Sequence, residues 1–273
     1  MADVERVVAA RDGTSLAVLE AGQGAPILLL HGLTATRRYV VMGSRLLERS
    51  GRHVVAYDAR GHGRSAPAPT PQAYGYDLLA EDLESVLDAL KIERATLAGA
   101  SMGAHTIARF ALAHPHRVAA IALITPAFDP DASGDYTGWD ALARGLRDGG
   151  VEGFIAAYDL VSMPERWRET VLTVLRQRLS AHEHLGAVAD ALEAVPRSRS
   201  FESLEDLSAI SVPTLVVGSR NESDPGHPLA VAERYAQSIP SARLLVEQPG
   251  ASPIAWQGGQ LSRALLELSD GVG

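Results

Sequence analysis

The stretch Ala95-Thr96-Leu97-Ala98-Gly99-Ala100-Ser101-Met102-Gly103-Ala104-His105 decides the fold. It begins as a short apolar strand, runs into the pattern G-x-S-x-G and continues as a helix. A serine hydroxyl becomes a useful nucleophile when a strained turn holds it out of its strand, where a base can reach it and backbone N–H groups face the developing oxyanion. A strand-to-helix turn with chance glycines would show the same five letters, so the rest of the chain must decide between the two interpretations.

Composition limits the function classes. The chain has 273 residues, of which 46% are hydrophobic and 21% charged, and this predicts one large α/β domain with an insertion. No apolar run approaches the ~20 residues that span a bilayer, and no apolar signal segment follows the first residues, so we expect a cytoplasmic protein without a membrane partner. The absence of cysteine excludes disulfides and a cysteine nucleophile. A net charge of −8 argues against nucleic acid as the main partner.

The N-terminal part predicts two strands of scaffold and then a central strand. Residues 4–9 and 16–20 flank the turn dipeptide Asp12-Gly13, which predicts an antiparallel hairpin at the sheet edge. Residues 26–30 form an uninterrupted apolar run, the pattern of a strand covered on both faces.

His31-Gly32-Leu33-Thr34 follows this central strand directly. A glycine at a strand end lets the next backbone N–H turn toward a ligand, so we assign the Leu33 N–H to an oxyanion hole. We interpret His31 as a structural histidine whose ring hydrogen-bonds the loop.

Alternating strands and helices continue from here. We expect a helix over 42–50, a buried strand over 53–57, a sheet-covering helix over 76–90 and, after the strand and helix around Ser101, another strand over 117–125. The glycine-rich loop after the strand 53–57 contains Asp58 and His62, which we interpret as architectural. His105 lies in the first turn of the helix after Ser101 and is interpreted as a core histidine.

His31-Gly32, the loop 58–65 and Gly99 through Gly103, in this order and on strand ends, resemble the α/β-hydrolase family. The resemblance covers most of the chain and is strongest to compact esterases, lactonases and perhydrolase-like members. It implies an α/β fold with a mainly parallel sheet, helices on both faces and a helical lid inserted after the strand that follows the nucleophile helix.

The lid is expected between residues 126 and 201, where the sequence changes to charged helical segments broken by prolines. The expected division is therefore a core of 1–125 and 202–273, with a lid of three or four helices. Aromatic residues of this segment are candidates for the substrate pocket or for the lid's own core: Tyr136, Trp139, Phe154, Tyr158 and Trp167.

In this family the loop after the next strand, 212–218, supplies the acid of the catalytic triad. Asp224 is the best match, because Asp-Pro-x-x-Pro before an amphipathic helix resembles the family's acid turn. Asn221 matches better by distance from the strand, but an amide cannot stabilise an imidazolium as a carboxylate does. Glu222 is the reserve acid, and Asp224 as a mere helix cap is the alternative.

The chain departs from the family after its last strand, 242–247. The family's catalytic histidine belongs in the following loop, where this sequence has Ser252, and no histidine occurs beyond His227. The family's Ser…Asp…His order survives only if His227 takes over. Asp224 and His227 on one turn would then converge on Ser101. The alternatives are the pair His182 and His184, which we interpret as a solvated helix face, and no histidine base at all.

Two functions follow from these alternatives. The first is a serine hydrolase for a small ester, lactone or thioester, in which Ser101 attacks, His227 carries the proton, Asp224 orients it, and the Leu33 and Met102 N–H groups bind the oxyanion. It needs a small-molecule substrate and neither a cofactor nor a metal. The second is a family member without hydrolase activity, either a cyclase or lyase type of enzyme or a ligand-binding protein. The sequence leaves the substrate and the oligomeric state open.

Overall fold

One eight-stranded sheet organises the chain in the computed structural model, which describes residues 3–132, 134–161, 163–221 and 224–271. The strand order is β1-β2-β4-β3-β5-β6-β7-β8. Neighbouring strands from β4 to β8 in this order are parallel, while β1 and β2 add an antiparallel edge. The sheet is therefore mainly parallel, as the sequence predicted. Its strands are β1 (Val4–Ala9), β2 (Ser15–Ala21), β3 (Ala25–Leu30), β4 (Arg52–Tyr57), β5 (Ala95–Ala100), β6 (Val118–Ile124), β7 (Thr214–Val217) and β8 (Ala242–Leu245).

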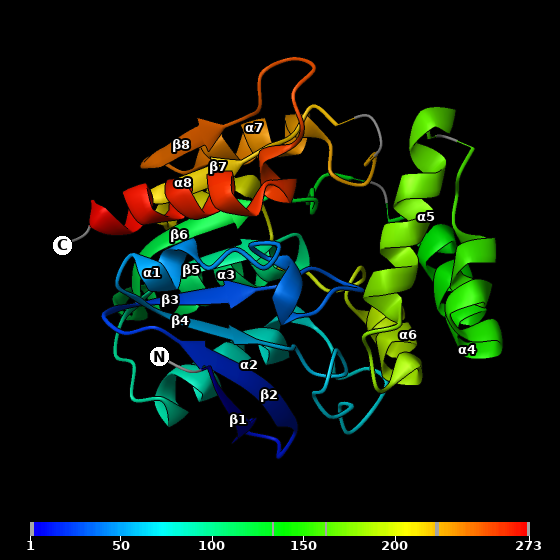
Figure 1. The fold of residues 1–273 in the computed structure, drawn as a ribbon, viewed down its shortest axis with the longest axis horizontal. Helices are drawn as coiled ribbons and strands as arrows, with labels where there is room; N and C mark the ends of the chain where they lie inside the picture. The colour runs from blue at the N-terminus through cyan, green and yellow to red at the C-terminus, as the bar shows by residue number, and fades with distance from the viewer. Residues whose placement is uncertain (1–2, 133, 162, 222–223, 272–273) are drawn as a thin grey trace.

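Helices cover both faces of this sheet (Figure 1). One face packs against α1 and α8, and the other against α2, α3 and α7. None of the described helices is long and apolar enough to cross a membrane. The α-helices are α1 (Leu46–Arg49), α2 (Tyr76–Ala89), α3 (Met102–Ala113), α4 (Thr137–Ala157), α5 (Glu165–Leu179), α6 (Leu185–Ala194), α7 (Leu229–Ser238) and α8 (Gly258–Asp270).

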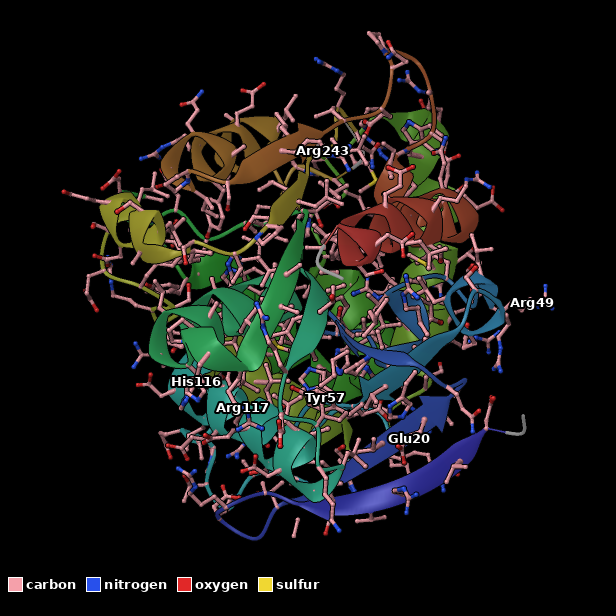
Figure 2. All side chains as sticks on the ribbon, turned by 90° about the vertical axis from the view of Figure 1, so that its left-hand side faces the viewer. Glu20, Arg49, Tyr57, His116, Arg117 and Arg243 are labelled. Atoms are coloured by element: carbon pink, nitrogen blue, oxygen red, sulfur yellow. The ribbon has the colours of Figure 1, made fainter. Side chains whose placement is uncertain are left out.

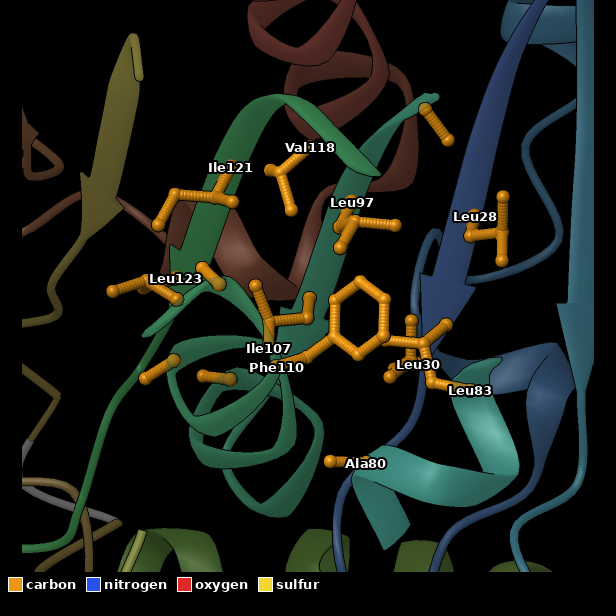
Figure 3. Close-up of a cluster of buried hydrophobic side chains, with 14 of the residues drawn as sticks. Leu28, Leu30, Ala80, Leu83, Leu97, Ile107, Phe110, Val118, Ile121 and Leu123 are labelled. Atoms are coloured by element: carbon orange, nitrogen blue, oxygen red, sulfur yellow. The ribbon is translucent and has the colours of Figure 1, made fainter. Parts of the chain in front are cut away.

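The apolar strands bury alternate side chains on the two faces, because successive side chains of a strand point to opposite sides. In β3, Leu28 and Leu30 pack into the core on the α2 and α3 side, whereas Ile27 and Leu29 pack on the α1 and α8 side. Figure 3 shows the first of these cores, in which Phe110 of α3 lies beside Leu30 and Leu97. Two buried faces explain why the central strands are continuous apolar runs.

The helix predicted over 42–50 is much shorter in the structure. Only Leu46–Arg49 is helical, because Met42 and Gly43 both have positive φ, at 47° and 74°. That backbone conformation cannot continue a right-handed helix. The hydrophobic spacing of the segment did not reveal this turn.

Helices α4, α5 and α6 follow β6 and precede β7. In Figure 1 they stand beyond the arrowheads of the central strands, and Figure 2 looks at the molecule from the opposite end. They share a hydrophobic cluster of their own, which includes Leu146, Phe154, Leu175 and Leu192. The division into a core and a separate lid over 126–201 stays a prediction, but the three described helices lie where it expects them.

Buried neutral histidines join the loops at this end of the sheet. His31 Nδ1 donates to its neighbour Gly32 O at 2.8 Å, and Nε2 accepts the Ala59 N–H at 2.9 Å. His105 Nε2 accepts the N–H groups of Ala127 and Phe128, each at 3.1 Å. Burial lowers the pKa of both His31 and His105 to about 3. Each ring therefore serves as a neutral acceptor, in agreement with the structural interpretation.

The free energy of unfolding should therefore decrease as the pH is lowered, and this decrease should begin at a pH above that at which carboxylates titrate. In the unfolded chain each imidazole binds a proton below about pH 6.5, whereas the folded protein excludes it down to about pH 3. Each of these histidines should therefore remove about 1.4 kcal/mol of unfolding free energy for every pH unit in that window. Urea unfolding between these two pH values measures the slope.

The variant His105→Gln should make this slope shallower, although it lowers stability at neutral pH by disturbing the buried contacts. The exposed His116 provides a matched control, since His116→Gln removes an imidazole that folding does not bury. Equal slopes in His105→Gln and His116→Gln would contradict the assignment.

Candidate active site

The turn at Ser101 is strained and held by close backbone packing. Ser101 has φ 49° and ψ −112°, in the left-handed half of backbone space, which costs a residue with a side chain about 1–3 kcal/mol. A Cβ on Gly99 would lie 2.4 Å from the Gly103 backbone, and one on Gly103 would lie 2.3 Å from Leu30 O. Both glycines of the G-x-S-x-G pattern are therefore sterically required, which rules out the interpretation as chance glycines.

Ser101, His227 and Asp224 form one hydrogen-bonded chain. The Ser101 hydroxyl lies 2.8 Å from His227 Nε2, and His227 Nδ1 lies 2.7 Å from Asp224 Oδ1. Because a carboxylate only accepts, Nδ1 carries the proton and Nε2 presents its lone pair to the Ser101 hydroxyl. The structure thus brings together the three residues that the sequence named.

A tight turn sets the distance between the acid and the base. The His227 N–H donates to Asp224 O at 3.1 Å, which closes a four-residue turn through Pro225 and Gly226. Proline is favoured at the second position of such turns, because its ring presets the φ that this position needs. Both side chains consequently come from one short loop between β7 and α7, and they reach Ser101 at the end of β5.

Electrostatics keep Asp224 ionised. Burial raises the pKa of its carboxyl, but the hydrogen bond with His227, the charge of His227 and the charge of Arg178 together outweigh burial and hold that pKa below its usual value. The carboxylate is therefore available to hold Nδ1–H of His227 at neutral pH.

The turn after β3 lies close to Ser101. A Cβ on Gly32 would lie 3.3 Å from Ala100 O and 3.3 Å from Ser101 Cβ, so the turn after β3 runs directly against the serine. Leu33 is the next residue, and Met102 begins helix α3. The N–H groups of Leu33 and Met102 donate to no residue that the structure describes, so both remain available to an oxyanion.

The alternative acid and base positions lie in other surroundings. The Asn221 N–H donates to Ser219 Oγ, which in turn donates to the buried carboxylate of Glu247. Glu222 lies outside the described residues. Ser252 is exposed, and its carbonyl accepts a hydrogen bond from the side chain of Gln257. Both ring nitrogens of His227 are occupied by other residues, Nδ1 by Asp224 and Nε2 by Ser101.

The three aromatic candidates lie in different surroundings. Tyr158 is half-buried beside Phe154, with ring centroids 6.0 Å apart, and the nearby Asp224 charge adds to burial in raising its pKa. Trp139 is 39% exposed, and the Tyr136 ring is covered by the guanidinium of Arg197 at 4.7 Å.

The interpretation of His182 and His184 as a solvated helix face is wrong for His182. Both lie in the turn between α5 and α6, and His182 is only 8% exposed. His182 Nδ1 accepts the Gly63 N–H at 2.8 Å, and Nε2 donates to Thr34 O at 3.1 Å. Across the described ranges no group of three or more His, Asp or Glu residues is arranged to hold a metal ion.

Arg178 is the residue near this site that sequence reasoning missed. It projects from α5, and its Nη2 donates to Leu33 O and to Thr34 Oγ1, each at 3.0 Å. In the sequence it is one of several arginines in a charged amphipathic helix. No local signal distinguishes it from its exposed neighbours.

Comparison with known proteins places this chain in a family. A 33% identical relative is a 2-hydroxy-6-oxononadienedioate/2-hydroxy-6-oxononatrienedioate hydrolase of Pseudomonas putida, aligned over 82% of this chain and 80% of its own length. A putative non-heme haloperoxidase of Mycobacterium phage D29 is 43% identical, but that alignment spans only 42% of this chain and 41% of the phage protein.

Solved structures agree over the whole chain. A thermophilic esterase from Thermogutta terrifontis has a TM-score of 0.79 at 26% identity and covers 100% of this chain and 99% of its own. An enol-lactonase from Burkholderia xenovorans has a TM-score of 0.77 at 25% identity, covering 96% and 99%. The model of the alpha/beta hydrolase fold matches residues 25–258. This chain therefore belongs to the α/β-hydrolase fold family.

Proposed function

We propose that this protein is a serine hydrolase that cleaves a small carboxylic ester, lactone or thioester through an acyl-enzyme. The observation that carries the proposal is the continuous hydrogen-bonded chain from the Ser101 hydroxyl through His227 to Asp224, at 2.8 and 2.7 Å. Membership of a family whose matched relatives include hydrolases, an esterase and an enol-lactonase supports it.

In this mechanism the Ser101 oxygen attacks the substrate carbonyl while His227 Nε2 takes the hydroxyl proton. Asp224 stabilises the imidazolium that forms and keeps its tautomer. His227 then returns the proton to the leaving alcohol or thiol, and the acyl group remains on Ser101. A water molecule, deprotonated by the same nitrogen, releases the acid.

The tetrahedral intermediates carry a negative oxygen, which the N–H groups of Leu33 and Met102 would bind. Removing one such donor typically costs about 3 kcal/mol of transition-state stabilisation. The strained Ser101 turn serves this arrangement, since it places the Met102 N–H at the start of α3 beside the nucleophile.

The segment 126–201 would form a lid that supplies the walls of the substrate pocket. Tyr136, Trp139 and Tyr158 are its proposed aromatic contacts, and the Asp224 charge acts on Tyr158. A small-molecule substrate fits a site placed between strand ends and such a layer of helices.

The variant Ser101→Ala should lose hydrolysis of a short p-nitrophenyl ester by at least about a thousandfold. Its melting temperature should stay nearly unchanged, because removing one hydroxyl opens no core cavity. A fluorophosphonate probe should label the wild type and not the variant. Turnover within tenfold of the wild type would exclude Ser101 as the nucleophile.

The variant His227→Ala should cost about as much activity as Ser101→Ala, because members of a triad act as a unit. Asp224→Asn should also be severe, since an amide leaves the imidazole in the wrong tautomer. The p-nitrophenyl ester assay used for Ser101→Ala measures both losses.

The variant Ser252→His tests the opposite hypothesis of a hydrolase that has lost its base. It restores a histidine where the family has one, but residue 252 is exposed and the Ser101 hydroxyl is already hydrogen-bonded to His227. We therefore expect no gain in esterase activity. A silent His227→Ala together with a gain in Ser252→His would refute the relocated base.

The variant Tyr158→Ala should change the preference for acyl chain length more than it changes the melting temperature, because it enlarges the proposed pocket. A series of p-nitrophenyl esters from acetate to octanoate measures the preference. Trp139→Ala tests the more exposed ring in the same way. Loss of stability with an unchanged preference would make these rings part of the lid's own core.

A further inference from the structure

Arg178 occupies an unusual electrostatic position. Its Nη2 donates to two neutral acceptors, the carbonyl of Leu33 and the hydroxyl of Thr34, each at 3.0 Å. Its Nε is buried and has no hydrogen-bond partner, and its Nη1 donates to no residue in the described part of the chain. Arg178 also forms no ion pair with any described carboxylate.

Another arginine of the same helix is exposed and forms an ion pair, unlike Arg178. Arg176 Nε pairs with Glu152 at 2.7 Å on the protein surface, where its side chain is 45% exposed. Arg178 is half-buried instead. Burial lowers its pKa, although the charge of Asp224 and the tyrosines Tyr158 and Tyr39 act in the opposite direction. Removing a cation from water without a paired anion is costly, so such a group is rarely retained for stability alone.

The location of Arg178 links this unpaired charge to the catalytic groups. Its hydrogen-bond acceptor Leu33 follows Gly32, which lies against the Cβ of Ser101. Its charge helps to lower the pKa of the Asp224 carboxyl, but Asp224 Oδ1 is hydrogen-bonded to His227. Arg178 therefore adds a positive charge beside the reaction centre without serving as the hydrogen-bond partner of the triad acid.

We propose that Arg178 binds a carboxylate group of the substrate, so that the compound hydrolysed is an ester, lactone or thioester that also carries a free carboxylate. This inference rests on the proposed hydrolase function and specifies its substrate class. A guanidinium presents a planar set of donors that matches a carboxylate, and a charge-assisted pair is among the stronger hydrogen bonds. Nη2 remains on the Leu33–Thr34 turn, and Nη1 supplies the donor to the substrate.

The kinetic test compares matched pairs of p-nitrophenyl esters. One ester of each pair is a half-ester of a dicarboxylic acid of four to six carbons, and the other is the neutral ester of a monocarboxylic acid of equal length. The wild type should prefer the charged member of at least one pair by tenfold or more in kcat/KM. Arg178→Gln should lower that ratio at least tenfold, mainly through KM. Arg178→Lys keeps the charge without the planar fork and should retain part of the preference.

Arg176→Gln is the matched control, because it removes the same charge from the same helix at the exposed ion pair with Glu152. It should leave the ratio unchanged. The proposal is overturned if the wild type shows no preference, if Arg176→Gln lowers the ratio as much as Arg178→Gln, or if Arg178→Gln slows both esters equally. Equal slowing would mean that Arg178 only positions the oxyanion turn.

Binding measurements separate this inference from the proposed function. Glutarate and its uncharged diamide can be titrated into Ser101→Ala by calorimetry, with and without the additional change Arg178→Gln. Binding of glutarate that weakens at least tenfold in the double variant, while the diamide binds poorly to both, supports the carboxylate site even if no ester is hydrolysed. Glutarate binding that is independent of Arg178 overturns it, even in an active hydrolase.

Discussion

The structure depends on a close contact between two neighbouring strand ends. Ser101 has a positive φ in the turn after β5, and Gly103 packs against the backbone of β3 at a separation that leaves no room for a Cβ. The same closeness brings the turn at Gly32 against the Ser101 side chain. The end of β3 and the turn at Ser101 are therefore held together by backbone contacts that leave no room for larger residues at Gly103.

The proposed acid and base, Asp224 and His227, come from one part of the chain. The family pattern takes the acid and the base from two different loops, whereas here Asp224 and His227 share one closed turn. A turn holds its first and fourth residues close together by its own hydrogen bond, so their spacing does not require two loops to pack correctly. The proposed triad needs no histidine in the loop after β8, where Ser252 is exposed.

Local patterns predicted most of the fold and much of the candidate site. The apolar runs of β3 and β5 and the glycines around Ser101 report constraints that act over a few residues, and the turn Asp224 to His227 is equally local. The shortened helix at 46–49 was missed because positive φ at Met42 leaves no mark in hydrophobic spacing.

The residues that sequence reasoning misjudged have distant partners. His182 contacts Thr34 and Gly63, and Arg178 contacts Leu33, across separations of more than one hundred residues. No spacing rule within α5 distinguishes an arginine that reaches this turn from one that faces water. Only the three-dimensional structure shows these contacts.

The attachment of α5 to the turn at Leu33 and Thr34 has a mechanical consequence. Arg178 holds Leu33 O and Thr34 Oγ1, and His182 holds Thr34 O. Thr34 itself has φ 66°, a conformation that needs support from its surroundings. Any displacement that lifts the end of α5 from the core breaks these bonds and frees the strained turn to relax. The position of α5 and the conformation of the Leu33–Thr34 turn are thus coupled mechanically through these three hydrogen bonds.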